Sequence, residues 1–168
     1  MKIINQCILK GHHFTFALPT LNETSLLVEG FKKLSTLSKH YRFHSPKAKL
    51  TTQELNYFLD IDHYDHFAIG VIEKIKDKIH GIAFIRYIRD QSDLSTAEVA
   101  LAIVDSHHKL GLGSELYRQL IYHAKQNNIT TFTHYILNEN RAMLKLLKKF
   151  DATFSQGVSG TTKVTVLL

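Results

Sequence analysis

The sequence predicts a mixed α/β (α+β) domain, and three observations carry that prediction. Short apolar stretches of strand character alternate with amphipathic helical patterns, most clearly in the second half of the chain. The chain has 168 residues, 44% of them hydrophobic, which is enough for one domain with a buried core. No linker, repeat or low-complexity stretch divides it. We therefore expect one domain over residues 1–168, to which residues 1–13 can be an N-terminal extension.

The first half predicts three strands and two helices, each bounded by turn or capping residues. In order, these are a strand at 14–18 ended by Pro19, a helix capped by Thr20 or Asn22 and running to about Leu37, a short helix from Thr51 or Thr52 through Phe58, and strands at 67–73 and 79–88. The start of the chain has a short apolar run broken by Asn5 and Gln6, so it predicts neither a signal peptide nor a membrane span.

The second half predicts strands and helices in strict alternation. They are a strand at 97–104, a helix at 111–126, a strand at 131–137, a helix capped by Asn138 and running to Lys149, and a closing strand at 163–168. The helix at 111–126 carries an apolar stripe of Leu112, Leu116, Leu120 and Ala124, which is typical of a helix packed on a sheet.

Composition favours a cytoplasmic protein that binds an acidic ligand. The one cysteine, Cys7, excludes an internal disulfide and fits a reducing compartment. The net charge of +6 suits a phosphorylated ligand. Basic and aromatic residues mix between Lys39 and Lys49, but a short helix with solvated cations explains them, so we expect no nucleic-acid partner. Nothing predicts membrane binding or a particular oligomeric state.

The turn from His108 to Gly113 is the most informative segment. It places two glycines where a helix begins, and a helix N-terminus offers unpaired N–H groups and a partial positive charge to a phosphate. No Lys-Ser or Lys-Thr follows Gly113, which excludes a P-loop, and Leu116 replaces the third glycine of a dinucleotide fingerprint. On spacing alone, a structural strand-to-helix turn explains the glycines equally well.

The surrounding residues resemble a known family. His108, Gly111 and Gly113 match the Gln/Arg-x-x-Gly-x-Gly/Ala motif of the Gcn5-related N-acetyltransferases (GNAT), and Asn140-Arg141-Ala142-Met143 with Leu146 resembles their second motif. The segments Ser38–Pro46, Ile61-Asp62 and Ala97–Ala100 are similar to the acetyltransferase domain of bacterial protein-lysine acetyltransferases. The resemblance implies the GNAT fold, in which helices flank a central mixed, mostly antiparallel sheet. That sheet is splayed between its fourth and fifth strands.

The resemblance also implies acetyl-CoA as co-substrate. Backbone N–H groups would bind its pyrophosphate, and the strand at 97–104 would hold its pantetheine arm and polarise the thioester carbonyl. The implied cofactor-binding residues are Ala102, Ile103, Val104, His108, Lys109, Leu110, Gly111, Leu112, Gly113, Ser114 and Asn140. Asn140 can contact the cofactor or cap its helix.

By the same resemblance, Glu98 is the catalytic general base and a protein lysine the acceptor. On spacing alone, a solvated strand-end glutamate is the simpler interpretation of Glu98. Two alternatives stay open: a small amine such as a polyamine, aminoglycoside or amino acid, and a non-catalytic acetyl-CoA sensor. A small polycation would need several carboxylates in the cleft, which Asp60, Asp62, Asp65 and Glu98 could supply.

Three further features complete the expectations. The chain has eleven histidines, including His63, His66, His107 and His108, but adjacent loop residues rarely point at one centre, so we expect no metal site. Leu147 stands where many GNAT enzymes have a tyrosine, as is common in the protein-lysine subfamily. Asp151 stands where a glycine usually follows the last helix, which alters the helix C-cap.

Overall fold

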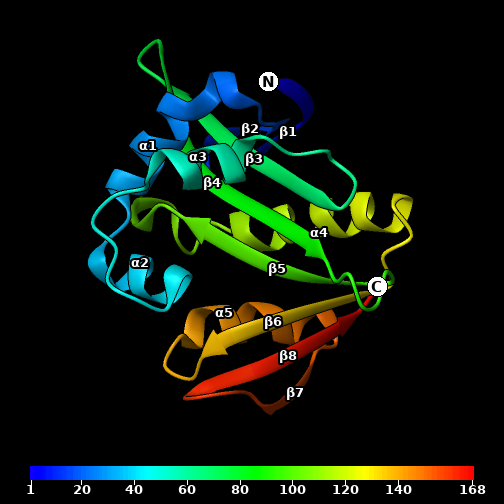
Figure 1. Ribbon diagram of the computed structural model, residues 1–168. Helices are drawn as coiled ribbons and strands as arrows, with labels where there is room; N and C mark the ends of the chain where they lie inside the picture. The colour runs from blue at the N-terminus through cyan, green and yellow to red at the C-terminus, as the bar shows by residue number, and fades with distance from the viewer.

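The computed structural model describes residues 1–168 as one eight-stranded sheet with helices on both faces (Figure 1). The strand order is β1-β2-β3-β4-β5-β6-β8-β7. Every neighbouring pair is antiparallel except β5 and β6, which run parallel. This confirms the predicted mixed, mostly antiparallel sheet. The elements are β1 Lys2–Leu9, β2 His12–Leu18, α1 Thr24–Lys33, α2 Thr36–Phe43, α3 Thr52–Leu59, β3 His66–Ile75, β4 Lys78–Arg89, β5 Thr96–Ile103, α4 Leu112–Gln126, β6 Thr131–Leu137, α5 Arg141–Leu147, β7 Thr153–Gln156 and β8 Thr161–Leu167.

The sheet divides the helices into two layers. In Figure 1, α1, α2 and α3 lie on one face, and α4 and α5 lie on the other. The predicted apolar stripe of α4 is buried in the main core with inward side chains of β3, β4 and β5, such as Ile69, Ile85 and Val99. No helix is long and apolar enough to cross a membrane.

Residues 2–9, for which the sequence predicted no element, form the edge strand β1. This strand pairs with β2 from Lys2 opposite Leu18 to Leu9 opposite His12. The hairpin turn uses Lys10 and Gly11, both with positive φ. The same hairpin reaches the functional half of the chain, because Lys10 Nζ donates to the carbonyl oxygen of Lys109 at 2.8 Å.

The helix predicted to run to about Leu37 is instead two helices. Thr20 caps the first turn as expected, in a capping box with Glu23. The backbone then becomes extended at Leu34 (ψ 135°), and α2 starts afresh with Ser35 as its N-cap. A distant carboxylate stabilises this second start: Asp105 accepts hydrogen bonds from Ser35 N, Ser35 Oγ and Ser38 Oγ at 2.7–2.8 Å. Periodicity alone does not report such a tertiary cap.

The C-terminal third differs from the prediction at a cap and at a strand. Asn138 is not the cap of α5; its side chain accepts a hydrogen bond from Thr162 Oγ1 at 2.7 Å. Asn140 is the cap, because its Oδ1 accepts from the N–H of Met143 at 3.2 Å. The short strand β7, which pairs with β8, was not predicted. All four of its residues are exposed, so it lacks the buried face on which strand prediction depends.

Candidate active site

The parallel strands β5 and β6 separate after three pairs of residues. These are Thr96 with Thr131, Ala97 with Phe132, and Glu98 with Thr133. Beyond Glu98 the two strands diverge, as Figure 1 shows, and β6 continues its pairing with β8 instead. The predicted splay between these strands is confirmed, and it places Glu98 at the vertex of the opening.

The turn that leads from β5 into α4 presents unpaired backbone N–H groups at this opening. Gly111 is the N-cap of the 15-residue helix, with a φ of 91° that favours glycine. Its carbonyl oxygen accepts from the N–H groups of Ser114 and Glu115. The N–H groups of the five residues from Lys109 to Gly113 donate to no protein acceptor. These donors and the helix dipole make an anion-binding cradle.

Two members of the predicted cradle have structural partners. The N–H of His108 donates to the carbonyl oxygen of Asp105, and its imidazole Nε2 donates to the carbonyl oxygen of Ile103 at 2.9 Å. The N–H of Ser114 is bonded within the turn to Gly111. His108 and Ser114 therefore shape the cradle, and the residues between them supply its free donors.

Gly113 serves packing. A Cβ at this position would lie 3.3 Å from Cδ1 of Ile103 and 3.4 Å from Cδ2 of Leu146. The missing side chain lets α4 approach both β5 and α5, which sets the position of the cradle against the open strand edge.

Only one of the three predicted strand residues turns its N–H toward the opening. The N–H of Val104 donates to the carbonyl oxygen of Ile82 at 2.9 Å, so this donor is already used within the sheet. Antiparallel pairing alternates along a strand, so Ala102 also turns its N–H to β4. Ile103 and Leu101 face the side of β6. Leu101 was not predicted as a donor. Which N–H groups of β5 point to β4 depends on the residue that pairs with Ile82, and the sequence does not show this.

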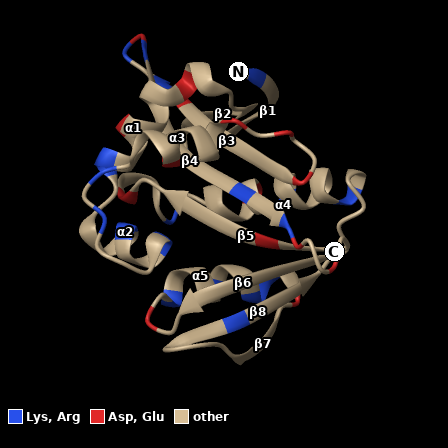
Figure 2. Cartoon of the chain, viewed as in Figure 1, with Lys and Arg blue, Asp and Glu red and all other residues tan.

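Glu98 is exposed, and its backbone is paired in the sheet while its carboxylate has no hydrogen-bond partner in the protein. It lies opposite Ile88 of β4, two residue pairs from Arg86 opposite Ala100, on the face of the sheet that carries α1 to α3. Figure 2 shows this one acidic position on β5 and basic positions on β4 and α2. Both Arg86 and Arg42 are close enough for the Glu98 charge to act on them.

The two arginines are partly buried against aromatic rings, which corrects the expectation that Arg42 is a solvated cation. The guanidinium carbon of Arg86 lies 4.5 Å from the ring centre of Phe58 and 4.7 Å from that of Tyr57. The guanidinium of Arg42 lies 5.0 Å from the ring centre of Phe43 and 6.0 Å from that of Phe58. Burial and the charge of Arg86 lower the pKa of Arg42 to about 10, so it remains a cation at neutral pH.

Two of the other candidate carboxylates are bound to other parts of the protein. Asp62 accepts hydrogen bonds from the N–H groups of Tyr64 and His66, which closes its own loop. Asp65 pairs with Arg89 at 2.6 Å. Asp60 follows the last residue of α3. Asp62 and Asp65 are thus engaged in contacts of their own and are not free to bind a polycationic acceptor.

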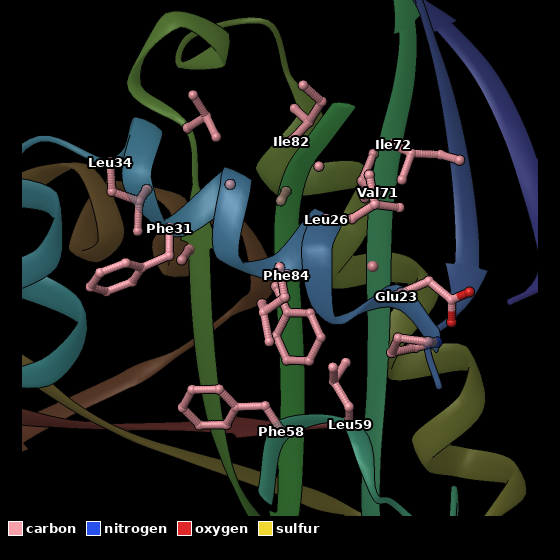
Figure 3. A pocket seen from close by; sticks show the side chains of 18 of the residues that line it. Glu23, Leu26, Phe31, Leu34, Phe58, Leu59, Val71, Ile72, Ile82 and Phe84 are labelled. Atoms are coloured by element: carbon pink, nitrogen blue, oxygen red, sulfur yellow. The ribbon is translucent and has the colours of Figure 1, made fainter. Parts of the chain in front are cut away.

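An apolar cavity of about 90 Å³ lies beneath α1, next to Arg42. Figure 3 shows Phe31 of α1, Phe58 of α3 and Phe84 of β4 projecting into the same space. Arg42 lines one side of this cavity, and the side chains of Ala102 and Val104 line it from β5. Those two residues therefore contribute side chains to the cavity, and their N–H groups point to β4.

The histidines group differently from the sequence expectation. His107 does not act with His108; its Nε2 lies 2.9 Å from Glu73 Oε2, and His12 Nδ1 lies 2.9 Å from Glu73 Oε1. These three side chains are the only set of three potential ligands with atoms within 4.8 Å of one another. Direct hydrogen bonds already pair all three groups. His63 and His66 belong to no such set.

The comparisons with known proteins agree with this geometry. Residues 32–152 match the model of the acetyltransferase (GNAT) family. The acetyltransferase Pat of Mycolicibacterium smegmatis is 29% identical over 127 residues, which are 76% of this chain and 37% of that protein. This chain thus spans about a third of the length of that curated relative.

Solved structures show the same fold. The GNAT domain of S. lividans PAT superposes with a TM-score of 0.87 at 24% identity, over 98% of this chain and 96% of that one. The putative acetyltransferase yncA from Salmonella typhimurium, solved with its cofactor acetyl-CoA, has a TM-score of 0.73 at 15% identity, over 92% and 94% of the two chains. The sheet splayed at Glu98, the cradle at α4 and the family match lead to one conclusion: this chain belongs to the GNAT family of acetyltransferases.

Proposed function

We propose that this domain transfers an acetyl group from acetyl-CoA to a protein lysine, with Glu98 as the general base. The observation that supports it most is the row of five free N–H groups, Lys109 to Gly113, at the opening between β5 and β6. The similarity to the acetyltransferase Pat and to a neighbour solved with acetyl-CoA supports the same reaction. We place the reaction in the cytoplasm, where Cys7 stays reduced.

The residues present fit the cofactor. The free N–H groups and the dipole of α4 suit a pyrophosphate, and the basic chain with its charge of +6 suits an anion. Asn140 caps α5 through its side-chain oxygen, so its NH₂ group remains free to donate a hydrogen bond to the cofactor. Acetyl-CoA, when bound, supplies an activated thioester.

The edge of β5 suits the reacting end of the cofactor. The N–H groups of Ile103 and Leu101 point to the opening, where they can hold the pantetheine arm and donate to the thioester oxygen. A preorganised donor of this kind contributes about 3–4 kcal/mol to transition-state stabilisation. The bond from His108 Nε2 to the carbonyl oxygen of Ile103 fixes the strand end at this point.

Glu98 answers the remaining chemical need, which is a neutral amine. A lysine side chain with a pKa of about 10.4 is almost fully protonated at pH 7, so its free base costs about 4–5 kcal/mol. An exposed carboxylate at the vertex of the opening can take that proton directly or through a water molecule. Leu147 is fully buried and offers no proton to a departing thiolate, so that proton comes from solvent in this proposal.

Calorimetry with acetyl-CoA tests the cofactor site. We expect micromolar binding by the wild type and its loss in Gly111→Glu, which puts a carboxylate into the cradle. Gly160→Glu is the matched control, because both glycines have positive φ (91° and 76°) and open space where a Cβ would be. The control should bind normally. A folded wild type that does not bind acetyl-CoA would overturn the proposal.

Turnover by Glu98→Gln tests the base. We expect unchanged acetyl-CoA binding, a turnover lower by about 10²–10⁴-fold at pH 7, and partial recovery as the pH rises toward the pKa of the amine. Glu29→Gln, on the outer part of α1, is the control. An equal rate for Glu98→Gln and wild type at pH 7 would exclude Glu98 as the base. Cofactor binding without turnover of any acceptor would favour a non-catalytic module.

A further inference from the structure

We propose that Arg42 and Arg86 form an anion subsite beside Glu98 that binds a carboxylate of the acceptor close to its reacting amine. This inference rests on the proposed acetyltransferase function and adds the substrate class. The contacts of the two arginines, the charge balance of their surroundings and an unpaired buried donor support it.

The two guanidinium groups converge although they come from distant parts of the chain. Arg42 is on α2 and Arg86 is on β4, and both guanidiniums lie over the ring of Phe58. Tyr57 flanks Arg86, and Phe43 flanks Arg42. Aromatic faces hold arginines in place without neutralising them, so the pair stays positively charged and oriented.

No carboxylate in the protein pairs with either arginine. Ten ion pairs are formed within 4.0 Å, and neither Arg42 nor Arg86 takes part in any of them. The Nη1 atom of Arg86 is buried and has no hydrogen-bond partner. Buried polar groups normally have a partner, so this donor points to a group that arrives with a ligand.

The charge balance of the cluster is also incomplete. Glu98 is the one carboxylate whose charge acts on both arginines. His66 is adjacent to Arg86, and burial together with that arginine lowers the pKa of His66 to about 4, so it is neutral at pH 7. Two cations against one anion leave a net charge of +1. An ammonium group enters such a site more easily when the acceptor brings a carboxylate of its own.

A carboxylate is the group that best fits this pair. Guanidinium groups bind carboxylates through paired N–H donors, and two arginines around one anion are a common arrangement for recognition. A polyamine or an aminoglycoside has no such group, and at this site it meets two cations against the single carboxylate of Glu98. The carboxylate can come from an Asp or Glu beside the target lysine in a protein, or from the α-carboxylate of a free amino acid.

The test compares acceptors that differ only in charge. Matched peptides with Lys flanked by Asp or by Asn are assayed with acetyl-CoA, beside free amino acids and their amides. In the pairs from the acceptor class that the enzyme uses, we expect the acceptor with the carboxylate to have a KM about 10–100-fold lower than its uncharged partner. Arg42→Gln and Arg86→Gln should each abolish that difference. The peptide pairs and the amino acid pairs identify the source. Arg118→Gln, an exposed site on α4, is the control.

Two further measurements keep the test decisive. Acetyl-CoA affinity and the melting temperature of each variant should match the wild type, which separates recognition from damage to the fold, and Arg42→Glu should favour peptides with basic neighbours of the lysine. Equal KM values for charged and uncharged acceptors would overturn the subsite while leaving the acetyltransferase intact. If no acceptor turns over, peptide binding to the CoA-saturated protein is measured, and equal affinity for both peptides would overturn it as well. A folded wild-type protein that does not bind acetyl-CoA would count against the proposed function and not against the subsite alone.

Discussion

At the scale of single residues, two positions at helix ends have a left-handed backbone but different side chains. Gly111 and Asp151 both have positive φ, at 91° and 49°. Gly111 begins α4 beside the cradle, where glycine meets the requirement without strain. Asp151 ends the last helical turn in the left-handed region with a side chain attached. The absence of glycine at 151 therefore leaves the turn in place and adds a local cost.

Asp151→Gly should stabilise the protein by about 0.5–1 kcal/mol. Glycine adopts the left-handed conformation without the steric cost of a side chain, which stabilises the folded state by about 1–2 kcal/mol. The greater conformational freedom of glycine in the unfolded chain offsets about half of that. Urea unfolding measures the difference. The reverse change in a matched turn, Gly160→Asp, should destabilise by a similar amount. A lower stability of Asp151→Gly would mean that the carboxylate has a stabilising role.

At the scale of elements, a buried polar network joins the N-terminal hairpin to the cofactor turn. Glu73 of β3 bonds to His12 of β2 and to His107, which immediately precedes His108. Ser106 Oγ lies 2.9 Å from His107 Nδ1 and completes the chain. Burial opposes ionisation of Glu73, but the hydrogen bonds from His107 and His12 outweigh it, so the pKa of Glu73 is lowered.

Glu73→Gln should therefore destabilise the protein in a pH-dependent way. A lowered pKa means that the ionised carboxylate stabilises the fold above its unfolded pKa of about 4.3. That contribution disappears as the pH falls through the lower pKa of the folded state. We expect a difference in unfolding free energy of about 1–3 kcal/mol at pH 7 that shrinks steadily below pH 4. A difference that stays constant from pH 7 to pH 3 would contradict this account.

At the scale of the whole molecule, one arginine ties together the closed end of the splayed sheet. Arg89, with only 4% of its side chain exposed, pairs with Asp65 and donates to the carbonyl oxygens of Leu94 and Asn127. Leu94 lies just before β5, and Asn127 lies between α4 and β6. Because β5 and β6 share only three paired positions, this side chain limits how far the two halves of the sheet can separate.

Arg89→Leu should lower the unfolding free energy by about 3 kcal/mol, since it leaves buried acceptors without donors. It should also weaken acetyl-CoA binding, because the segments that precede β5 and β6 are then no longer connected through Arg89. Hydrogen exchange should accelerate first at residues 94–98 and 127–133. Arg118→Leu, whose side chain is 63% exposed, should change stability by less than about 0.5 kcal/mol. Equal effects of the two substitutions would show that Arg89 has no special role.

Local patterns predicted most of the elements in their order, but not β1, β7 or the break between α1 and α2. Apolar periodicity predicted α4 within one residue of its observed start at Leu112, and the glycine turn predicted the helix N-terminus at Gly111. The splayed sheet and the role of Glu98 were predicted from the family resemblance. Spacing alone favours a solvated surface position for Glu98. The start and the apolar stripe of α4 depend on residues close together in the sequence, so the sequence by itself determined them.

Only the tertiary structure decided which groups are free to act. Asp105 divides the predicted helix at Leu34 through bonds to Ser35 and Ser38, 70 and 67 residues away. The bond from Val104 to Ile82 sets the parity of β5 and turns Ile103 to the opening. Arg42 and Arg86 meet over Phe58 through packing of α2 and α3 on the sheet. Each outcome depends on contacts between residues that are distant in the sequence. Such hydrogen bonds and ring contacts form only where two surfaces pack together, and a local sequence pattern contains no information about that packing.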